Sequence, residues 1–286
     1  MTRPYYWSVR RELWENRFVY LAPLIVCAVV LFAALVSNTF SLPDRVTRAA
    51  ADTDLARRHS MVVSHLSLPP APIMLSTFIV AMFYCLDALY GERRDRSILF
   101  WKSLPVSDRT VVLSKLSVPM LVLPAFALIL GITVQIILFV HGTLVLTLRG
   151  VGPGLLWREF RFMQEPIVML YGTVVHVLWY APIYGWLLLV SAWAKRVPLV
   201  WAVMPLMVIS AFEKGVFGSM NFMNMLQYRV GGAMKEAFVF QTGAIDEFSQ
   251  LSIGRYVSRP GLWGGLLFAF LCVVLAIHLR RKREPI

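Results

Sequence analysis

The chain has 286 residues, of which 58% are hydrophobic and 15% charged, and its formal net charge is +12. Typical globular chains are about 25% charged, and several uncharged runs here approach the roughly 20 residues that cross a hydrocarbon core as a helix. This composition excludes a water-soluble enzyme and a disordered scaffold. Because the basic residues lie between apolar segments, membrane orientation explains the charge better than nucleic-acid binding does.

Six membrane-spanning helices are predicted. Backbone groups in lipid must be hydrogen-bonded within the protein, and runs such as 121–130 lack the alternating polarity of a membrane β-strand, so helices are expected. In chain order the predicted spans cover residues 18–40, 71–89, 116–140, 167–193, 198–217 and 262–279. The predicted fold class is therefore an all-α integral membrane protein with six spans.

Lys and Arg gather at both termini and in the segment 91–109 that follows the second span. The positive-inside rule then predicts that both termini and this segment are cytoplasmic. The longer connections 41–70, 141–165 and 218–259 are expected outside, and the first is mostly polar. Apolar residues near helical spacing in 220–238 predict an amphipathic helix, lying either on the outer membrane surface or against the tops of the spans.

Residues 4–17 are predicted to form an interfacial elbow helix on the cytoplasmic side. Pro4 suits a first helical turn. One face then gathers aromatic and apolar side chains, among them Trp7, Leu13 and Trp14, and another face carries Ser8, Glu12 and Glu15. Tryptophans at headgroup level anchor such a helix. The helix either anchors the chain alone or also contacts a cytoplasmic partner.

No catalytic, cofactor or metal site is expected within the chain. None of its six lysines follows a glycine, which excludes a phosphate-binding P-loop, and neither HExxH nor GxSxG occurs. The three cysteines lie in apolar spans without metal-binding spacing. In the fourth span, His176 and Tyr180 are candidates for lining a cargo path, because intramembrane ionisable residues often mark function. A hydrogen-bonded structural histidine is the alternative.

The segment 91–109 carries the strongest signal. Charged residues come first, an apolar stretch with Phe100 and Trp101 follows, and Leu104-Pro105 breaks the helix. Ser107 is then a good N-cap for the helix that leads into the third span. Aromatic side chains on the cytoplasmic side need a cover, which is either lipid headgroups or another protein.

These residues resemble a known family. The run Glu92-Arg93, then Ser97, then Ser103-Leu104-Pro105-Val106-Ser107 is similar to the loop of ABC-2-type transporter permeases. In that family a Glu-Arg pair ends the second helix, a short coupling helix follows, and a Leu-Pro-Val-Ser-like turn starts the third. Many relatives carry Gly-Thr where this chain has Arg96-Ser97. The six spans and the N-terminal interfacial helix also fit, so the resemblance covers residues 1–286 as one transmembrane permease domain.

The resemblance implies a multi-pass protein of the bacterial plasma (inner) membrane that pairs with a second permease chain, expected to be a second copy, and with two ATP-binding subunits. ATP and Mg would be bound by those subunits. The implied activity is export of an amphipathic or hydrophobic cargo such as a drug, peptide or lipid, and the scarcity of charges in the spans favours such a cargo over small ions. The implied ATPase-coupling interface comprises Glu92, Arg93, Arg96, Ser97, Phe100, Trp101, Leu104 and Pro105.

Three questions stay open from the sequence. Glu92 is expected either to accept hydrogen bonds from the short helix or to pair with a partner's arginine, with a surface ion pair to Arg93 or Arg96 as the alternative. The complex could instead sense or mature a partner without moving cargo. An integral membrane lipid-modifying enzyme is a further alternative, but it needs a convergent set of His, Asp or Glu that the sequence does not indicate.

Overall fold

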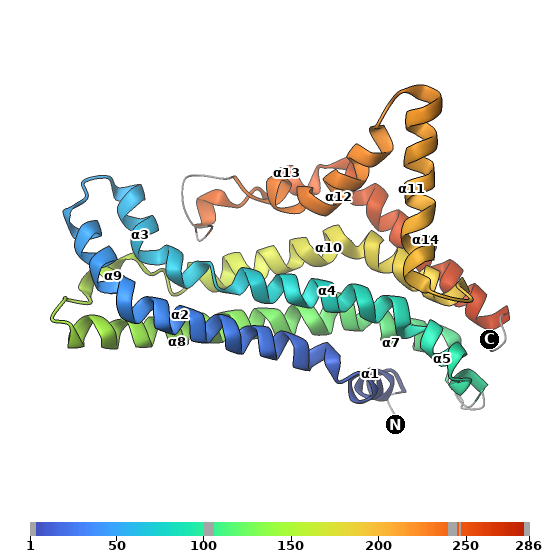
Figure 1. Ribbon diagram of the computed structural model, residues 1–286, viewed down its shortest axis with the longest axis horizontal. Coiled ribbons are helices and arrows are strands. Elements are labelled where there is room, and N and C mark those ends of the chain that lie inside the picture. The colour runs from blue at the N-terminus through green and yellow to red at the C-terminus, as the bar shows by residue number, and fades with distance from the viewer. Residues whose placement is uncertain (1–3, 100–105, 240–244, 246, 283–286) are drawn as a thin grey trace.

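The computed structural model describes residues 4–99, 106–239, 245 and 247–282, and its described residues are built from helices (Figure 1). No β-strand forms among them, and their one bridge pairs Phe238 with Leu251. Six helical segments of this described part are long and apolar enough to cross a membrane: Phe18–Ala51, Pro70–Arg94, Asp108–Leu148, Gln164–Trp193, Pro198–Phe217 and Pro260–Lys282. The prediction of an all-α membrane protein with six spans is confirmed.

Long helices form an elongated bundle (Figure 1). They are α2 (Phe18–Ala51), α4 (Pro70–Ala88), α8 (Leu123–Leu148) and α10 (Gln164–Trp193), with α14 (Pro260–Lys282) packed against α10. Both chain termini lie at one end of the bundle, which we call the terminal end, together with α1 (Pro4–Glu15), α5 (Tyr90–Arg94) and α7 (Asp108–Ser117). The opposite or distal end carries α3 (Leu55–Ser67) and α9 (Gly154–Glu159).

The first connection is more helical than its polarity indicated. Helix α2 continues to Ala51, and α3 folds back against it. Along α2, Leu42, Val46 and Ala49 recur at i, i+4 and i+7 and are at most 2% exposed. They join Val62, Val63 and Leu66 of α3 in one apolar cluster. This buried stripe is why residues 41–70 form a helical hairpin at the distal end.

The third span begins as α7 and continues through a π-helical turn, η1 (Val118–Val122), into α8. Ser107 is the N-cap of α7, as predicted, and its hydroxyl accepts a hydrogen bond from the Thr110 backbone N–H at 3.2 Å. Pro119 lies within the π turn and has no N–H to donate, which favours a local departure from α-helical bonding. The turn therefore separates α7 from the long membrane segment α8.

Helix α11 (Pro198–Phe217) has the bounds predicted for the fifth span, and it projects away from the bundle (Figure 1). Helix α12 (Asn221–Ala237) then returns along α10, followed by η2 (Phe248–Gln250) and α13 (Ile253–Val257). Trp179 and Tyr180 of α10 donate hydrogen bonds to the carbonyls of Arg229 and Val230, each at 2.7 Å. Helix α12 therefore packs against α10, and its placement relative to the membrane surface stays a prediction.

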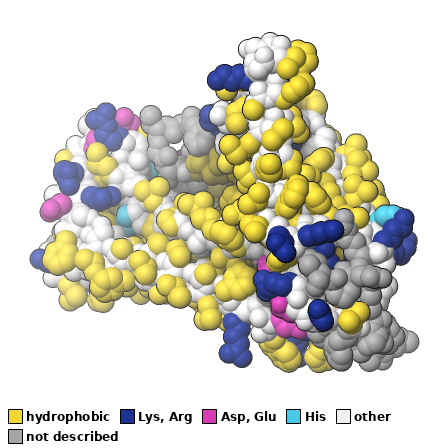
Figure 2. All heavy atoms as spheres, turned by 45° about the vertical axis from the view of Figure 1, so that its right-hand side comes forward, with side chains coloured by type: hydrophobic (Ala, Val, Ile, Leu, Met, Phe, Trp, Pro, Cys, Tyr) yellow, Lys and Arg dark blue, Asp and Glu magenta, His cyan; other side chains and the backbone are white. Residues whose placement is uncertain are grey.

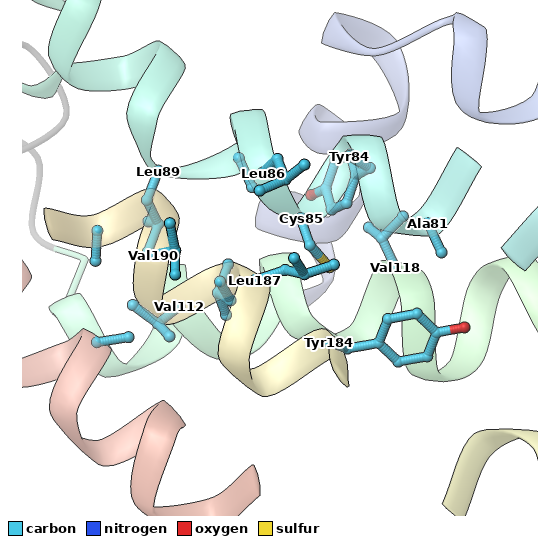
Figure 3. Packing of buried hydrophobic residues seen from close by; sticks show 14 of the residues in the cluster. Ala81, Tyr84, Cys85, Leu86, Leu89, Val112, Val118, Tyr184, Leu187 and Val190 are labelled. Carbon is cyan, nitrogen blue, oxygen red and sulfur yellow. The ribbon is translucent and has the colours of Figure 1, made fainter. Parts of the chain in front are cut away.

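The apolar core of the terminal end joins α4, α7, α10 and α14. Figure 3 shows Cys85 of α4 beside Leu187 of α10, and Leu89, which follows α4, beside Val190 of α10. Helices α10 and α14 approach closely at Gly185, where an added Cβ would lie 3.1 Å from backbone atoms of Ala269. Small residues at membrane helix contacts allow such close approach. This core supports the polar site described next.

Candidate functional site

A buried network of charged side chains ties together the elements of the terminal end. We call it the charge network. It contains the carboxylates of Glu12, Glu92 and Asp108 and the cations of Arg11, Lys115 and Arg280, with the Tyr84 hydroxyl as a neutral member. Its residues come from α1, α4, α5, α7 and α14, which are far apart in the sequence.

Glu12 is the most enclosed member, with 1% of its surface exposed. Its carboxylate accepts hydrogen bonds from Lys115 Nζ at 2.9 and 3.0 Å and from Arg11 at 2.7 Å. The Tyr84 hydroxyl donates a further bond at 2.9 Å. The polar face of α1 therefore points into the protein, where it binds α7 and α4.

Glu92 connects this group to the end of the chain. Its carboxylate lies 3.1 Å from Lys115 Nζ, 3.3 Å from Arg11 and 3.0 Å from Arg280. Arg280 also reaches Asp108 at 3.5 Å. Among the described residues, the ion pairs of Glu92 are thus made with α1, α7 and α14 and not with Arg93 or Arg96. Bonds of Glu92 to the short helix or to a partner's arginine stay predictions.

The network is balanced in charge. Its three carboxylates face three cations, so the formal charges of these members cancel. Glu15, which is 47% exposed and pairs with Arg11 at 3.6 Å, lies outside this set. Taking a charge out of water costs several kcal/mol, which close partners must offset, and removing one member of a buried pair typically costs about 3–5 kcal/mol. Each member therefore depends on the others, and the elements that carry them are held together.

The pKa directions at α1 follow from the same geometry. Burial alone would raise the pKa of Glu12, but the charges of Lys115 and Arg11 outweigh it and hold this pKa below its ordinary value of 4.5. Burial opposes the charged form of Arg11, yet Glu12 and its neighbours raise the pKa of its guanidinium. Both groups are ionised at neutral pH.

Beside the charge network, Arg93 connects α5 to the C-terminal end of α10. Its side chain is 3% exposed and donates to the carbonyls of Ser191 and Ala194 at 2.9 and 2.6 Å. The Ser191 hydroxyl in turn accepts the backbone N–H groups of Leu89 and Tyr90, each at 2.9 Å. A cation at the C-terminal carbonyls of α10 is favoured by the helix dipole. The Glu92-Arg93 pair thus fixes α5 to four other helices.

The loop after α5 turns sharply at Arg96, whose φ of 57° lies in the left-handed region. This conformation favours glycine, and Arg96 adopts it despite its side chain. The Ser97 hydroxyl bonds the Glu92 carbonyl at 3.4 Å, and residues 97–99 are helical. Ile98 is buried at 2% exposure, whereas Leu99 is 58% exposed. The predicted site residues Phe100, Trp101, Leu104 and Pro105 lie outside the described residues.

The aromatic face of α1 points outward. Trp7 and Trp14 are 52% and 62% exposed, and Leu13 is half-buried against the terminal core. The Arg10 guanidinium lies over both tryptophan rings, 5.2 and 4.5 Å from their centroids. This arrangement, with aromatics outside and carboxylates inside, is what a helix between lipid headgroups and a polar protein site requires.

His176 and Tyr180 lie together in the middle of α10. The His176 ring bonds the Tyr184 hydroxyl at 3.1 Å, and Phe78 of α4 contacts both His176 and Tyr180. Tyr180 also holds α12 through Val230. These contacts give both residues a role in joining α4, α10 and α12, as in the structural alternative for His176.

The spans also contain a buried carboxylate that the sequence did not indicate. Glu165, at the start of α10, is 2% exposed and accepts hydrogen bonds from Gln135 of α8 and from Ser67 at 2.6 Å. The expectation of a span interior without buried charge is therefore wrong at this point. The sequence did not indicate that Glu165 is buried, because this residue ends the long connection 141–165 that was expected outside the spans.

Sequence reasoning named Glu92 but missed its partners Lys115 and Arg280, and it missed Glu12 as the second carboxylate that binds Lys115. In the sequence, Lys115 and Arg280 were used only to predict the membrane orientation. Lys115 could have been singled out, because it is the one charged residue in the run 110–148. Among the described residues, no group of His, Cys, Asp and Glu is arranged to hold a metal ion. Comparison of the chain with models of known protein families, with curated proteins and with solved structures found no match.

Proposed function

We propose that this chain is the membrane-spanning permease subunit of an ABC-2-type exporter. It would work with a second permease chain and with two separate ATP-binding subunits that bind ATP and Mg. The cargo would be amphipathic or hydrophobic, and the chain itself would catalyse no covalent step. The proposal rests on the resemblance of residues 92–107 to the family's coupling loop and on the geometry around that loop.

The observation that carries the proposal is the placement of Glu92. This residue of the coupling-like loop is ion-paired at once to α1, α7 and α14, within 3.3 Å in each case. A force applied to the loop by a partner would therefore move the N-terminal helix, the third span and the last span together. The π turn after Lys115 offers a place for α7 to pivot relative to α8.

The backbone at Arg96 gives separate support. Many members of the family carry glycine at this position, and Arg96 has the positive φ that favours glycine. This backbone conformation supports the resemblance, although the side chain at this position differs.

The pairing with a second permease chain is supported by α11. Figure 2 shows apolar side chains over the height of this projecting helix. Among them, Phe212 and Phe217 are 62% and 71% exposed and Met207 is 62% exposed. Lipid or a second chain would cover this surface, and packing of α11 against a partner copy would enclose the cargo route between two bundles.

Purification of the tagged chain from its native membranes tests the proposal. We expect a P-loop ATPase to co-purify and to hydrolyse ATP. Leu99→Ser should reduce its recovery by at least about tenfold, because burying a leucine contributes about 1.5–3 kcal/mol. Leu68→Ser is the matched control, because Leu68 is 63% exposed at the distal end. Absence of any ATPase, or equal recovery with both variants, would contradict the proposal.

Topology is tested independently with single cysteines. Asp95→Cys places a thiol in the coupling-like loop, and Thr53→Cys places one between α2 and α3 at the distal end. Cytoplasmic termini predict that a membrane-impermeant thiol reagent labels only the Thr53→Cys protein in intact cells. The native Cys27, Cys85 and Cys272 are buried and should stay unlabelled. The reverse labelling pattern would invert the orientation and remove the coupling loop from the ATPase side.

A further inference from the structure

A basic pocket lies at the distal end, between the last turns of α2 and the first turns of α3. Its volume is about 700 Å³, and its lining comprises Arg45, Arg48, Asp54, Ala56, Arg57, Ser60, Met61 and Ser64. Figure 2 shows basic side chains gathered on the lobe at the left of the molecule, which is this end. No residue that lines the pocket belongs to the charge network, and the proposed function does not use the pocket.

The arginines of this pocket are not neutralised by ion pairs. Their neighbour Arg58 shows the contrast, because it pairs with Glu159 of α9 at 3.2 Å. No carboxylate of the described residues forms an ion pair with Arg45, Arg48 or Arg57. Arg48 donates only to the Asp44 carbonyl at 3.2 Å. Three positive charges thus converge on one concave surface.

Asp54 lowers this charge by one unit, but its carboxylate is already engaged. It caps α3 by accepting the backbone N–H groups of Ala56 and Arg57 at 3.0 and 3.4 Å. The pocket keeps a formal charge of +2. The hydroxyls of Ser60 and Ser64 lie in the lining beside the arginines and add neutral donors. Guanidinium groups with hydroxyls form a site suited to a phosphate group, because the guanidinium fork binds two oxygens at once.

His65 shows that the Arg45 charge acts on its surroundings. Burial and the nearby Arg45 together lower the pKa of His65 to about 4. The imidazole is therefore neutral, and neither of its ring nitrogens has a hydrogen-bond partner among the described residues. Among the described residues, Arg45 lines the pocket and forms no ion pair with a carboxylate.

The depth of the pocket matches the headgroup layer of a membrane. Exposed apolar side chains follow α2 outward as far as Phe40, which is 71% exposed. Arg45 comes five residues later, about 7.5 Å along the helix axis at 1.5 Å per residue. The headgroup region on each side of the hydrocarbon is about 5–7.5 Å thick. With the edge of the hydrocarbon placed at Phe40, Arg45 would lie at the level of the phospholipid phosphates, and Arg48, about 12 Å from Phe40, would lie just outside it.

We propose that the α2–α3 pocket binds a phosphate-bearing anion through Arg45, Arg48 and Arg57. The phosphate belongs either to the headgroup of an anionic phospholipid or to a free phosphate ion. The pocket volume, which lies within the usual range for ligands larger than one ion, and its depth both favour the headgroup.

The test uses the full chain in a zwitterionic detergent and two soluble probes, short-chain phosphatidylglycerol and inorganic phosphate. Binding is measured by calorimetry for the wild type, for the Arg45→Gln/Arg57→Gln double variant and for Arg149→Gln. Arg149 is the matched control, because it is an exposed arginine at the end of α8 and does not line the pocket. The chosen arginines are at the surface, so the variants should keep the thermal stability of the wild type.

We expect the wild type and Arg149→Gln to bind phosphatidylglycerol equally and the double variant to bind it at least about a hundredfold more weakly, about tenfold for each lost charged hydrogen bond. Tighter binding of phosphatidylglycerol than of phosphate identifies a lipid headgroup site, and equal binding identifies a phosphate ion site. The proposal is overturned if the wild type binds neither probe, or if the double variant binds as the wild type does.

Discussion

Replacement of Glu12 by glutamine tests whether the charge network holds α1 in place. Glutamine keeps the size of the side chain and can still accept the bond from Tyr84, but the network changes from a formal charge of zero to +1. Lys115, which is 3% exposed, then keeps only Glu92 as an anionic partner, at 3.1 Å. Removing one partner of a buried pair costs about 3–5 kcal/mol, and the remaining Glu92 favours the lower end of that range.

A loss of about 3 kcal/mol should increase the opening of α1 by roughly a hundredfold. Backbone hydrogen exchange of the protein in nanodiscs measures this opening directly, because α1 and α7 would lose protection together. Glu15→Gln is the matched control on the same helix. Glu15 is 47% exposed and pairs with Arg11 at 3.6 Å, so its loss should cost less than about 1 kcal/mol.

The double variant Glu12→Gln/Lys115→Met separates a charge effect from a packing effect. It restores charge balance, because Glu92 and Asp108 then face Arg11 and Arg280. We expect it to recover most of the protection lost in Glu12→Gln, since removing both charges of a buried pair leaves no uncompensated charge, and the amide of the introduced glutamine can still bond Tyr84 and Arg11. Equal exchange in Glu12→Gln and Glu15→Gln, or a double variant that opens as much as the sum of its single changes, would refute the role of the network.

Three further predictions address other parts of the terminal end. The pKa of Glu12 is lowered in the folded protein, so its stabilisation is complete above the unfolded value near 4.5 and is lost as pH falls below it. The protection factor of α1, which corrects the exchange rate for the intrinsic pH dependence of amide exchange, should therefore be constant from pH 7 to 5 and fall below about pH 4, and Glu12→Gln should reduce this fall. Arg93→Lys keeps the charge but loses the guanidinium that binds the Ser191 and Ala194 carbonyls. Thermal unfolding should show that the free energy of unfolding falls by about 1.5–3 kcal/mol. An unchanged melting temperature would mean that these hydrogen bonds do not hold α10. Gly185→Ala should lower the free energy of unfolding by about 1–3 kcal/mol, because the added Cβ would push α10 away from the backbone of Ala269 on α14. Gly264→Ala is the control, because no atom lies near its added Cβ, and it should be neutral or stabilising in the same assay.

The spans could be predicted from sequence because the cost of lipid exposure acts on each segment separately. A long apolar run is enough to identify a membrane span, whatever packs against it. The bounds of α11 could therefore be predicted without knowledge of its neighbours. The α2–α3 hairpin could not be found in the same way. Its buried stripe of Leu42, Val46 and Ala49 is interrupted by arginines that belong to the pocket face.

The charge network could not be predicted for a related reason. The polar face of α1 would point to water in a soluble protein, but a helix at a membrane surface turns its tryptophans outward and its carboxylates inward. The partners of Glu12 and Glu92 come from α7 and α14, and no local pattern records which distant cation completes a pair. Which carboxylates and cations pair with one another can be determined only from the packed arrangement of the helices.

The internal role of the Glu92-Arg93 pair decides which variants can identify a partner. Both side chains are buried, and their contacts lie within this chain, so a Glu92→Gln variant would weaken α1, α7 and α14 whether or not an ATPase exists. Loss of transport in that variant would follow from either cause. Leu99 differs because its side chain is 58% exposed. A loss of ATPase recovery in Leu99→Ser with unchanged thermal stability would therefore report the partner's surface alone, and a loss of stability in the same variant would show that the loop serves only its own fold.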